Sequence, residues 1–166
     1  MTAVGIDVGK ANLDVAVDGR QGVTRYANSR SGITKLVKWL KGLDAPRIVV
    51  EATGGYEEPV LEACCDAQLW VCRVNPRQAR NFARATGELA KTDAIDARLL
   101  ALMARLLSDR LRPYAAPLAW QRELRDWLRR RGQIVMTLQA QKQQAEAEAE
   151  AEATRPTWDV PPHWRC

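Results

Sequence analysis

Four carboxylates of this chain lie in local contexts that suit metal ligands: Asp7, Glu51, Asp93 and Asp96. Asp7 lies within the apolar run VGIDVG, and Glu51 ends the apolar run IVVE. Asp93 and Asp96 are three residues apart, so on a helix they share one face. Mg²⁺ and Mn²⁺ prefer carboxylate oxygens, and two such ions can clamp a phosphodiester during cleavage or strand transfer. The four acids therefore indicate metal-dependent chemistry on a nucleic acid.

Taken singly, each of these acids also has a purely structural explanation. Asp7, beside a glycine, could end a strand, and Glu51 could cap the helix that follows it. Asp93 and Asp96 could complement the dipole at a helix N-terminus. The structural explanations are less convincing for the four acids together, because the expected fold brings the first strand, the end of the fourth strand and a late helix close to one another. That arrangement is typical of a two-metal site.

Positive charge is concentrated in the middle of the chain. The 166 residues carry a formal net charge of +5, whereas residues 73–131 hold 14 Arg and Lys against 6 Asp and Glu, a net of +8. Such a segment is typical of a protein that binds a polyanion, and a solvated helical face is the structural alternative. The residues predicted to contact nucleic acid are Arg77, Arg80, Arg84, Lys91, Arg98, Arg122, Arg125 and Arg129.

The elements that must position the acids begin with three expected strands at residues 4–8, 13–17 and 23–27. Asp18 and Gly19 favour a tight hairpin turn between the second and third strands. Ser31 is the predicted N-cap of a first helix, and strand 47–51, helix 57–67 and strand 69–74 follow. Strands that alternate with helices imply a parallel part of the sheet. The fold class is therefore α/β, with an RNase H-like mixed sheet that opens with three antiparallel strands.

Beyond the sheet, the sequence predicts helices. Pro76 opens one, Gly87 interrupts it, and the next carries Asp93 and Asp96. That helix is expected to pack on the sheet through an apolar stripe: Leu99, Leu100, Leu102, Met103, Leu106 and Leu107. We expect a catalytic domain over residues 1–112, a helical coiled-coil segment over 113–153 and a disordered tail over 154–166.

The helical segment carries apolar residues at a spacing of three to four, which is typical of a coiled coil. They are Trp120, Leu124, Trp127, Ile134 and Leu138. Arg131 and Gln141 interrupt this seam, so the coiled coil is expected to be short or imperfect. A homo-oligomer formed through this segment is predicted.

Other classes of protein are disfavoured by composition. No apolar run approaches the ~20 residues that cross a bilayer, and no secretion signal opens the chain, so we expect a cytoplasmic protein with no membrane contact. The four cysteines form no C-x-x-C pair, and His163 is the single histidine, which argues against a zinc site. The thiols are expected to be buried or incidental.

Four segments together resemble a known family. GIDVGK, VVEATGGY, VNPRQAR and KTDAIDAR are similar to the motifs of the DEDD insertion-sequence transposases, which include the pilin-gene-inverting recombinases. The resemblance covers about residues 3–142. It implies a RuvC-like N-terminal domain, Mg²⁺ (or Mn²⁺) bound by Asp7, Glu51, Asp93 and Asp96, and DNA as the substrate. Some members of this family are guided by a structured RNA, so the resemblance implies RNA as a further partner.

The sequence departs from the family pattern after the coiled coil. Family members continue into a second domain that supplies a serine nucleophile, whereas the serines here are Ser29, Ser31 and Ser108. We therefore expect a truncated or frameshifted copy, or an isolated domain, that does not complete recombination by itself.

Three other functions stay open from the sequence. One is a stand-alone Holliday-junction resolvase, which needs no serine, and a second is a non-catalytic remnant that binds nucleic acid. The third is an ATP-using fold of the sugar-kinase or actin type, in which the turn at residues 7–9 would approach phosphate. That fold needs two similar lobes, and the sequence offers one.

Overall fold

The computed structural model describes residues 1–87 and 93–154 of the chain. Two compact units are formed, one of residues 1–116 and a second that begins at Pro117. The first unit contains β1 (Thr2–Val8), β2 (Asn12–Val17), β3 (Thr24–Ala27), α1 (Arg30–Lys41), β4 (Pro46–Glu51), α2 (Glu58–Asp66), β5 (Trp70–Val74), α3 (Pro76–Thr86) and α4 (Asp93–Leu107). The second contains α5 (Ala119–Ala153).

The sheet of the first unit has five strands in the order β3-β2-β1-β4-β5. β2 is antiparallel to both β1 and β3, whereas β4 runs parallel to both β1 and β5. The predicted mixed sheet with three antiparallel N-terminal strands is therefore confirmed. Parallel pairing of β1 with β4 brings the ends of these two strands to the same edge of the sheet.

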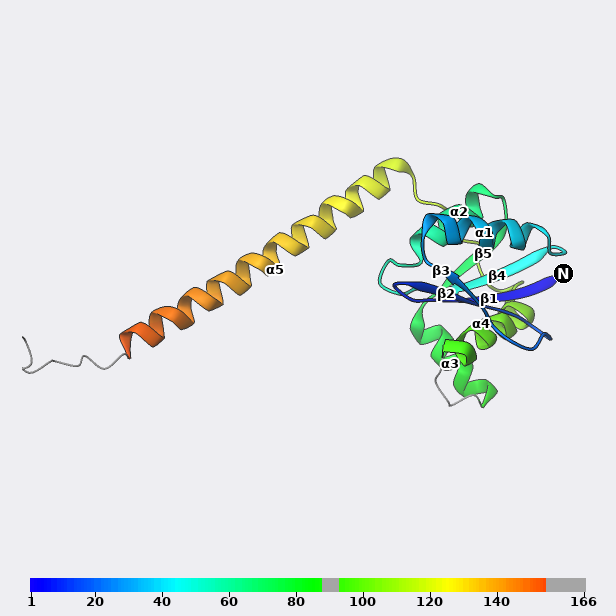
Figure 1. The fold of residues 1–166 in the computed structure, drawn as a ribbon, viewed down its shortest axis with the longest axis horizontal. Coiled ribbons are helices and arrows are strands. Elements are labelled where there is room, and N and C mark those ends of the chain that lie inside the picture. Colours follow the sequence, from blue (N-terminus) through cyan, green and yellow to red (C-terminus); the bar gives the residue numbers. More distant parts are fainter. Residues whose placement is uncertain (88–92, 155–166) are drawn as a thin grey trace, which may run out of the picture. The chain divides into compact units, whose positions relative to one another are not determined.

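The two faces of the sheet are covered by different helices (Figure 1). Val4, Ile6 and Val8 of β1 belong to a core shared with α1 and α2, which Leu36 and Leu61 complete. Because side chains alternate along a strand, the residues between them face the opposite side, where α4 lies. The acid in β1, Asp7, is therefore on the α4 side.

Gly5 allows α4 to approach β1 very closely. A Cβ at this position would lie 2.8 Å from the carbonyl carbon of Leu100, and closer still to the carbonyl oxygen of Ala97. Ala16, Ala97 and Ala101 form a small buried cluster beside it. This backbone contact sets how closely α4 approaches the sheet at Ala97, the residue that follows Asp96.

Two local predictions in the first unit are wrong. The N-cap of α1 is Ser29, in extended backbone, and its side chain accepts a hydrogen bond from the Gly32 amide at 3.3 Å. Both Ser29 and Ser31 are good caps by residue type, and the observed helix begins between them at Arg30. The β2–β3 connection is also longer than a tight hairpin, since residues 18–23 separate the strands and include two glycines with positive φ.

The apolar stripe of α4 is confirmed at Leu100, Met103 and Leu107, which belong to or pack against one core cluster, whereas Leu102 is only partly buried and lines another cavity. Leu99, Leu100 and Met103 are buried, whereas Leu106 is 52% exposed. At 100° per residue, Leu106 is rotated by roughly 200° from the buried Ala104, so it faces away from the sheet.

α5 is a single helix of 35 residues in which no residue is buried. Its large apolar side chains are exposed: Trp120, Leu124, Trp127, Leu128, Ile134, Val135, Met136 and Leu138. The coiled coil expected here stays a prediction. Within the described part of the chain, no helix is both long enough and apolar enough to cross a bilayer.

Candidate metal and nucleic-acid site

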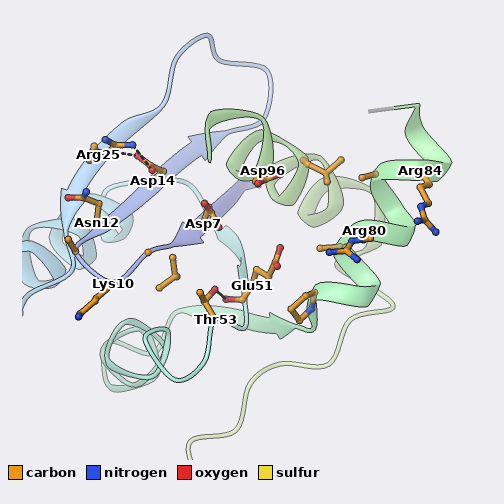
Figure 2. A pocket seen from close by; sticks show the side chains of 17 residues that line it. Asp7, Lys10, Asn12, Asp14, Arg25, Glu51, Thr53, Arg80, Arg84 and Asp96 are labelled. Atoms are coloured by element: carbon orange, nitrogen blue, oxygen red, sulfur yellow. Dashed lines mark hydrogen bonds and ion pairs between the residues drawn. The ribbon is translucent and has the colours of Figure 1, made fainter. Parts of the chain in front are cut away.

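Three of the predicted ligands line one cavity of about 670 Å³ in the first unit. Asp7 comes from β1, Glu51 from the end of β4, and Asp96 from the first turn of α4. Figure 2 shows the three carboxylates between the strand ends and the helices. Residues that are far apart in the sequence are thus brought together on one side of the sheet.

The register of β1 and β4 explains the proximity of the first two acids. Ile6 pairs with Val50 in the parallel ladder, so Asp7 and Glu51 follow the last pair on neighbouring strands. Val49, two residues before Glu51, packs with Leu100 of α4, which places the Glu51 side chain on the same face. Open α/β sheets bind ligands at this edge, beyond the carboxyl ends of their parallel strands.

The carboxylates of the cavity fit the divalent cation that the resemblance implies. In the described residues no three His, Cys, Asp or Glu side chains are close enough to one another to hold a single ion. Mg²⁺ commonly takes only one or two protein carboxylates, together with waters and substrate phosphates, and it prefers oxygen donors. The three partly buried carboxylates Asp7, Glu51 and Asp96 fit that mode of binding.

Two predicted site residues lie outside what the structure describes. Lys91 falls in the segment 88–92, and Asp93 begins α4 with a side chain whose position is not described. Their predicted roles as a nucleic-acid contact and a metal ligand therefore stay predictions.

The predicted basic residues separate into groups. Arg80 and Arg84 of α3 line the cavity, whereas Arg77 is exposed on the same helix outside the lining. Arg98 lines a different cavity, together with Arg20, because two residues along a helix turn it roughly 200° away from Asp96. The three remaining arginines, Arg122, Arg125 and Arg129, belong to α5 in the second unit.

The start of α3 fixes the direction from which Arg80 and Arg84 approach. The Asn75 side chain accepts from the Gln78 amide at 2.8 Å, and the Gln78 side chain accepts from the Asn75 amide at 3.2 Å. This capping box satisfies two amides that a helix end would otherwise leave unpaired. Gly87, with φ of 80°, ends the helix in the left-handed conformation, as the sequence indicates.

Sequence reasoning missed an ion pair in the cavity wall. Asp14 is buried, and its carboxylate accepts from Nε and Nη2 of Arg25 at 2.7 and 2.9 Å. Asp14 pairs with Asp7 in the β1–β2 ladder and with Arg25 in the β2–β3 ladder. The signal was an acid inside the apolar run LDVAV, which the strand register would have placed opposite Asp7.

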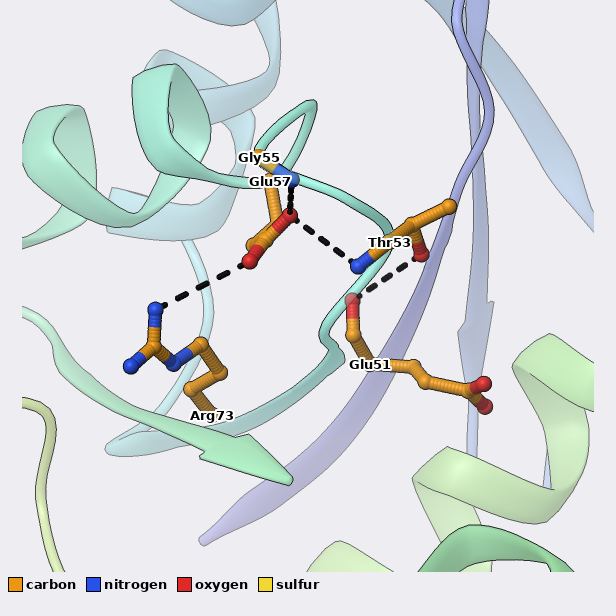
Figure 3. A network of polar contacts seen from close by, with 5 residues as sticks. All are labelled: Glu51, Thr53, Gly55, Glu57 and Arg73. Carbon is orange, nitrogen blue, oxygen red and sulfur yellow. Dashed lines mark hydrogen bonds and ion pairs between the residues drawn. The ribbon is translucent and has the colours of Figure 1, made fainter. Parts of the chain in front are cut away.

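Sequence reasoning also missed the buried carboxylate that holds the loop after Glu51 (Figure 3). Oε2 of Glu57 accepts from the amides of Thr53 at 3.0 Å and Gly55 at 2.9 Å, and Arg73 lies 3.7 Å from Oε1. The Thr53 hydroxyl in turn donates to the Glu51 carbonyl at 3.3 Å. Glu57, rather than Glu51, lies at the start of α2. The Glu51 side chain points away from the Glu57 carboxylate in Figure 3, and it lines the cavity.

A single amide side chain connects the two loops at the edge of the sheet. Nδ2 of Asn28 donates to the carbonyls of Gly9 at 2.9 Å and Tyr56 at 3.1 Å. The loop that follows Asp7 and the loop that follows Glu51 are thereby held to the same residue.

The three cysteines that the structure describes, Cys64, Cys65 and Cys72, do not line this cavity. Cys64 and Cys72 are buried free thiols, and burial raises the pKa of Cys64 to about 12. A thiol with that pKa is protonated at neutral pH and is a poor ligand or nucleophile. Buried thiols were expected, and Cys166 lies outside the described residues.

The fold of the first unit identifies a class of protein. The first unit is similar to a solved structure described as "T. thermophilus RuvC in complex with Holliday junction substrate", with a TM-score of 0.52 and 16% sequence identity. The similarity covers 69% of this chain and 99% of that one. The fold is RNase H-like, of the RuvC type, as predicted.

The sequence comparisons give the family within that class. A family model described as "Transposase", of the DEDD type, matches residues 4–148. The chain therefore belongs to the DEDD transposase family. It is 31% identical over 107 residues to the "Pilin gene-inverting protein" of Moraxella bovis, and 30% identical over the same length to that of Moraxella lacunata. These matches cover 60% of this chain and 33% of each relative, so the chain spans about a third of their length.

Proposed function

We propose that the first unit is the metal-dependent nuclease unit of a DNA transposase, which cleaves phosphodiester bonds during strand exchange. The observation that carries this proposal is the gathering of Asp7, Glu51 and Asp96 in one cavity that Arg80 and Arg84 also line. Membership of the transposase family, relatives named for gene inversion and a RuvC structure solved with a Holliday junction all support DNA as the substrate.

The acidic residues of the cavity would bind metal, and its basic residues would bind phosphate. Asp7, Glu51 and Asp96, together with Asp93, would hold Mg²⁺ or Mn²⁺. When bound, the metal would polarise the phosphodiester and favour deprotonation of the attacking water. Arg80 and Arg84 would contact neighbouring phosphates, and their charge would stabilise the strand in the cavity.

Cleavage of labelled DNA tests this proposal. The purified chain is incubated with a linear duplex and a four-way junction, with Mg²⁺, with Mn²⁺ or with a chelator. We expect divalent-dependent nicking that Asp7→Asn abolishes and that the exposed control Asp109→Asn retains. Nicking that persists in the chelator, or that Asp7→Asn leaves unchanged, would contradict a metal-dependent site at Asp7.

A stand-alone junction resolvase is the second candidate, because the similarity covers 99% of the RuvC chain. Preference for the four-way junction over the linear duplex in the same assay would favour this function. DNA binding without nicking of either substrate would favour the third function, a non-catalytic remnant that binds nucleic acid.

We also propose that α5 pairs with a second copy of the chain, as a short coiled coil. Support comes from the exposed apolar residues at a spacing of three to four, among them Trp120, Leu124 and Trp127. Leu124→Lys is expected to convert a dimer to a monomer in light scattering, whereas a charge change at the exposed Gln139 is not. A dimer that survives Leu124→Lys would exclude this seam as the interface.

A structured guide RNA is the second nucleic acid that we propose for the basic residues. α5 carries Arg122, Arg125 and Arg129 within a segment that the transposase family model matches. RNA binding that is unaffected by removal of these three charges would exclude them as its site.

A further inference from the structure

The cavity has a second basic wall, which lies across the acids from α3. Arg25 of β3 and Lys10 of the β1–β2 loop line the cavity, as do Arg80 and Arg84 of α3. Figure 2 shows Arg25 and Lys10 on one side and the two α3 arginines on the other, with Asp7, Glu51 and Asp96 between them. Positive side chains therefore flank the acids on both sides.

Arg25 is placed by the sheet register rather than by a flexible loop. Asp7, Asp14 and Arg25 are successive cross-strand partners on β1, β2 and β3. Directly opposed side chains lie on one face of a sheet, and two strand spacings separate Asp7 from Arg25 by roughly 10 Å. A phosphate near Arg25 would thus be a neighbour of the phosphate at Asp7, rather than the same one.

Asp14 holds the guanidinium of Arg25 in a defined orientation. The Asp14 side chain is 9% exposed and the Arg25 side chain is 58% exposed, so the pair has a buried acid and an accessible base. The carboxylate engages Nε and Nη2 of Arg25 and so holds the plane of the guanidinium in one orientation. Arginine suits such a position because its planar donors can serve a carboxylate on one edge and a phosphate on another.

We propose that Arg25, oriented by Asp14, binds a backbone phosphate of the DNA strand that occupies the cavity, next to the phosphate held at Asp7. In this arrangement Asp14 is a positioning residue and not a metal ligand, because both of its oxygens accept from Arg25. The strand is then held on both sides of the acids, by β3 on one side and by α3 on the other. This inference rests on the proposed function in one respect, which is that DNA enters this cavity.

A second ion pair of the first unit provides a matched control. Arg105 and Asp18 are 2.7 Å apart, the same distance as the Arg25 and Asp14 pair, and the Arg105 side chain is 49% exposed. Arg105 does not line the cavity. A loss of DNA binding that follows from the overall charge of the protein would therefore appear equally in Arg25→Gln and Arg105→Gln.

The experiment measures binding of fluorescein-labelled single-stranded and four-way-junction DNA by anisotropy, in a chelator so that cleavage does not compete. Arg25→Gln is expected to weaken binding roughly tenfold and to lower the slope of log K against log salt by about one. Arg80→Gln is expected to act similarly, and Arg105→Gln is expected to bind as the wild type does. Thermal unfolding followed by circular dichroism verifies that each variant is folded.

Asp14→Asn separates positioning from simple charge. This variant removes a negative charge, so a purely electrostatic account requires tighter DNA binding. If positioning matters, Asp14→Asn instead weakens DNA binding by roughly threefold. The two hydrogen bonds from Arg25 to the carboxylate are lost or weakened, because a neutral amide holds a guanidinium less firmly than a carboxylate does. If Asp14→Asn does not fold, Arg25→Lys replaces it, since lysine keeps the positive charge beside Asp14 but cannot make the paired hydrogen bonds. Weaker DNA binding by Arg25→Lys supports the proposal, and unchanged DNA binding overturns it.

The outcomes distinguish this inference from the proposed function. If Arg80→Gln weakens binding and Arg25→Gln does not, the second wall is excluded while the DNA site remains. If the wild type binds neither DNA, both the proposed function and this inference are overturned. If Arg25→Gln weakens binding to an RNA of the same sequence and leaves DNA binding unchanged, Arg25 serves RNA and the assignment to DNA is wrong.

Discussion

The helices α4 and α5 use the same types of residue in opposite ways. α4 buries Leu100 at 1% exposure against the sheet, whereas α5 leaves Leu124 at 50% exposure. The close contact of α4 with Gly5 fixes where Asp96 lies relative to β1, so the acid site depends on packing within the first unit. No residue of α5 is buried, so the role of its apolar residues depends on what binds to them.

The largest expected effect comes from a side chain added at the contact between α4 and β1. Gly5→Ala would drive a methyl group into the backbone of Ala97 and Leu100, which neither element can avoid without moving. We expect a loss of about 3 kcal/mol in the free energy of unfolding, at the upper end for overpacking. Urea denaturation followed by circular dichroism measures it.

Gly132→Ala is the matched change in α5. Nothing lies within 4 Å of a Cβ at this position, which is inside the helix. We expect a gain of about 0.5–1 kcal/mol in helix stability, seen as higher ellipticity at 222 nm. A destabilisation at Gly132 as large as that at Gly5 would remove the distinction between the two helices.

The second prediction compares two leucines. Leu100→Ala is expected to cost about 3 kcal/mol, because it opens a cavity between α4 and the sheet. Leu124→Ala is expected to stay within about 0.5 kcal/mol for unfolding of the first unit, because Leu124 is exposed and belongs to the second unit. Equal costs in thermal unfolding would show that Leu124 contributes to the same core.

The third prediction concerns the loop that follows Glu51. Glu57→Gln keeps the shape of the side chain but weakens its hydrogen bonds to Thr53 and Gly55 and its ion pair with Arg73. We expect a cost of about 2 kcal/mol, since hydrogen bonds to a charged group are worth about 1.5–3 kcal/mol. Glu123→Gln, on exposed α5, serves as the control in the same denaturation series, and a cost no greater than that of the control would mean that Glu57 does not hold this loop.

The fold and part of the site were predictable because they follow from local pattern. An apolar run that contains Asp7 and another that ends in Glu51 identified the strands, and parallel strands that end side by side explain why these acids meet. Spacing alone placed Asp96 on a helix beside them. Each of these inferences needs only the period of an element and the rule that parallel strands end together.

The remaining site residues depend on contacts between elements. Asp14 and Arg25 meet through the register of β2 and β3, which the sequence does not specify when the β2–β3 connection is longer than a tight turn. Glu57 resembled an ordinary residue at a helix start, because its partners are amides of the preceding loop. Arg98 lines a different cavity from Asp96, because residues close in sequence can face opposite sides of a helix, and its role as a nucleic-acid contact stays a prediction.

The central claim is that Asp7, Glu51 and Asp96 belong to one two-metal site, in which each ion takes one or two of these carboxylates, and Mn²⁺ binding followed by electron paramagnetic resonance tests it most directly. Titrations compare the wild type with Asp7→Asn, Glu51→Gln and Asp96→Asn, each with and without DNA, and with Asp109→Asn as the control. We predict that each of the three variants weakens Mn²⁺ binding by at least about tenfold, because a ligand of a hard cation has been lost. Equal Mn²⁺ affinity in the wild type and all three variants would contradict the claim.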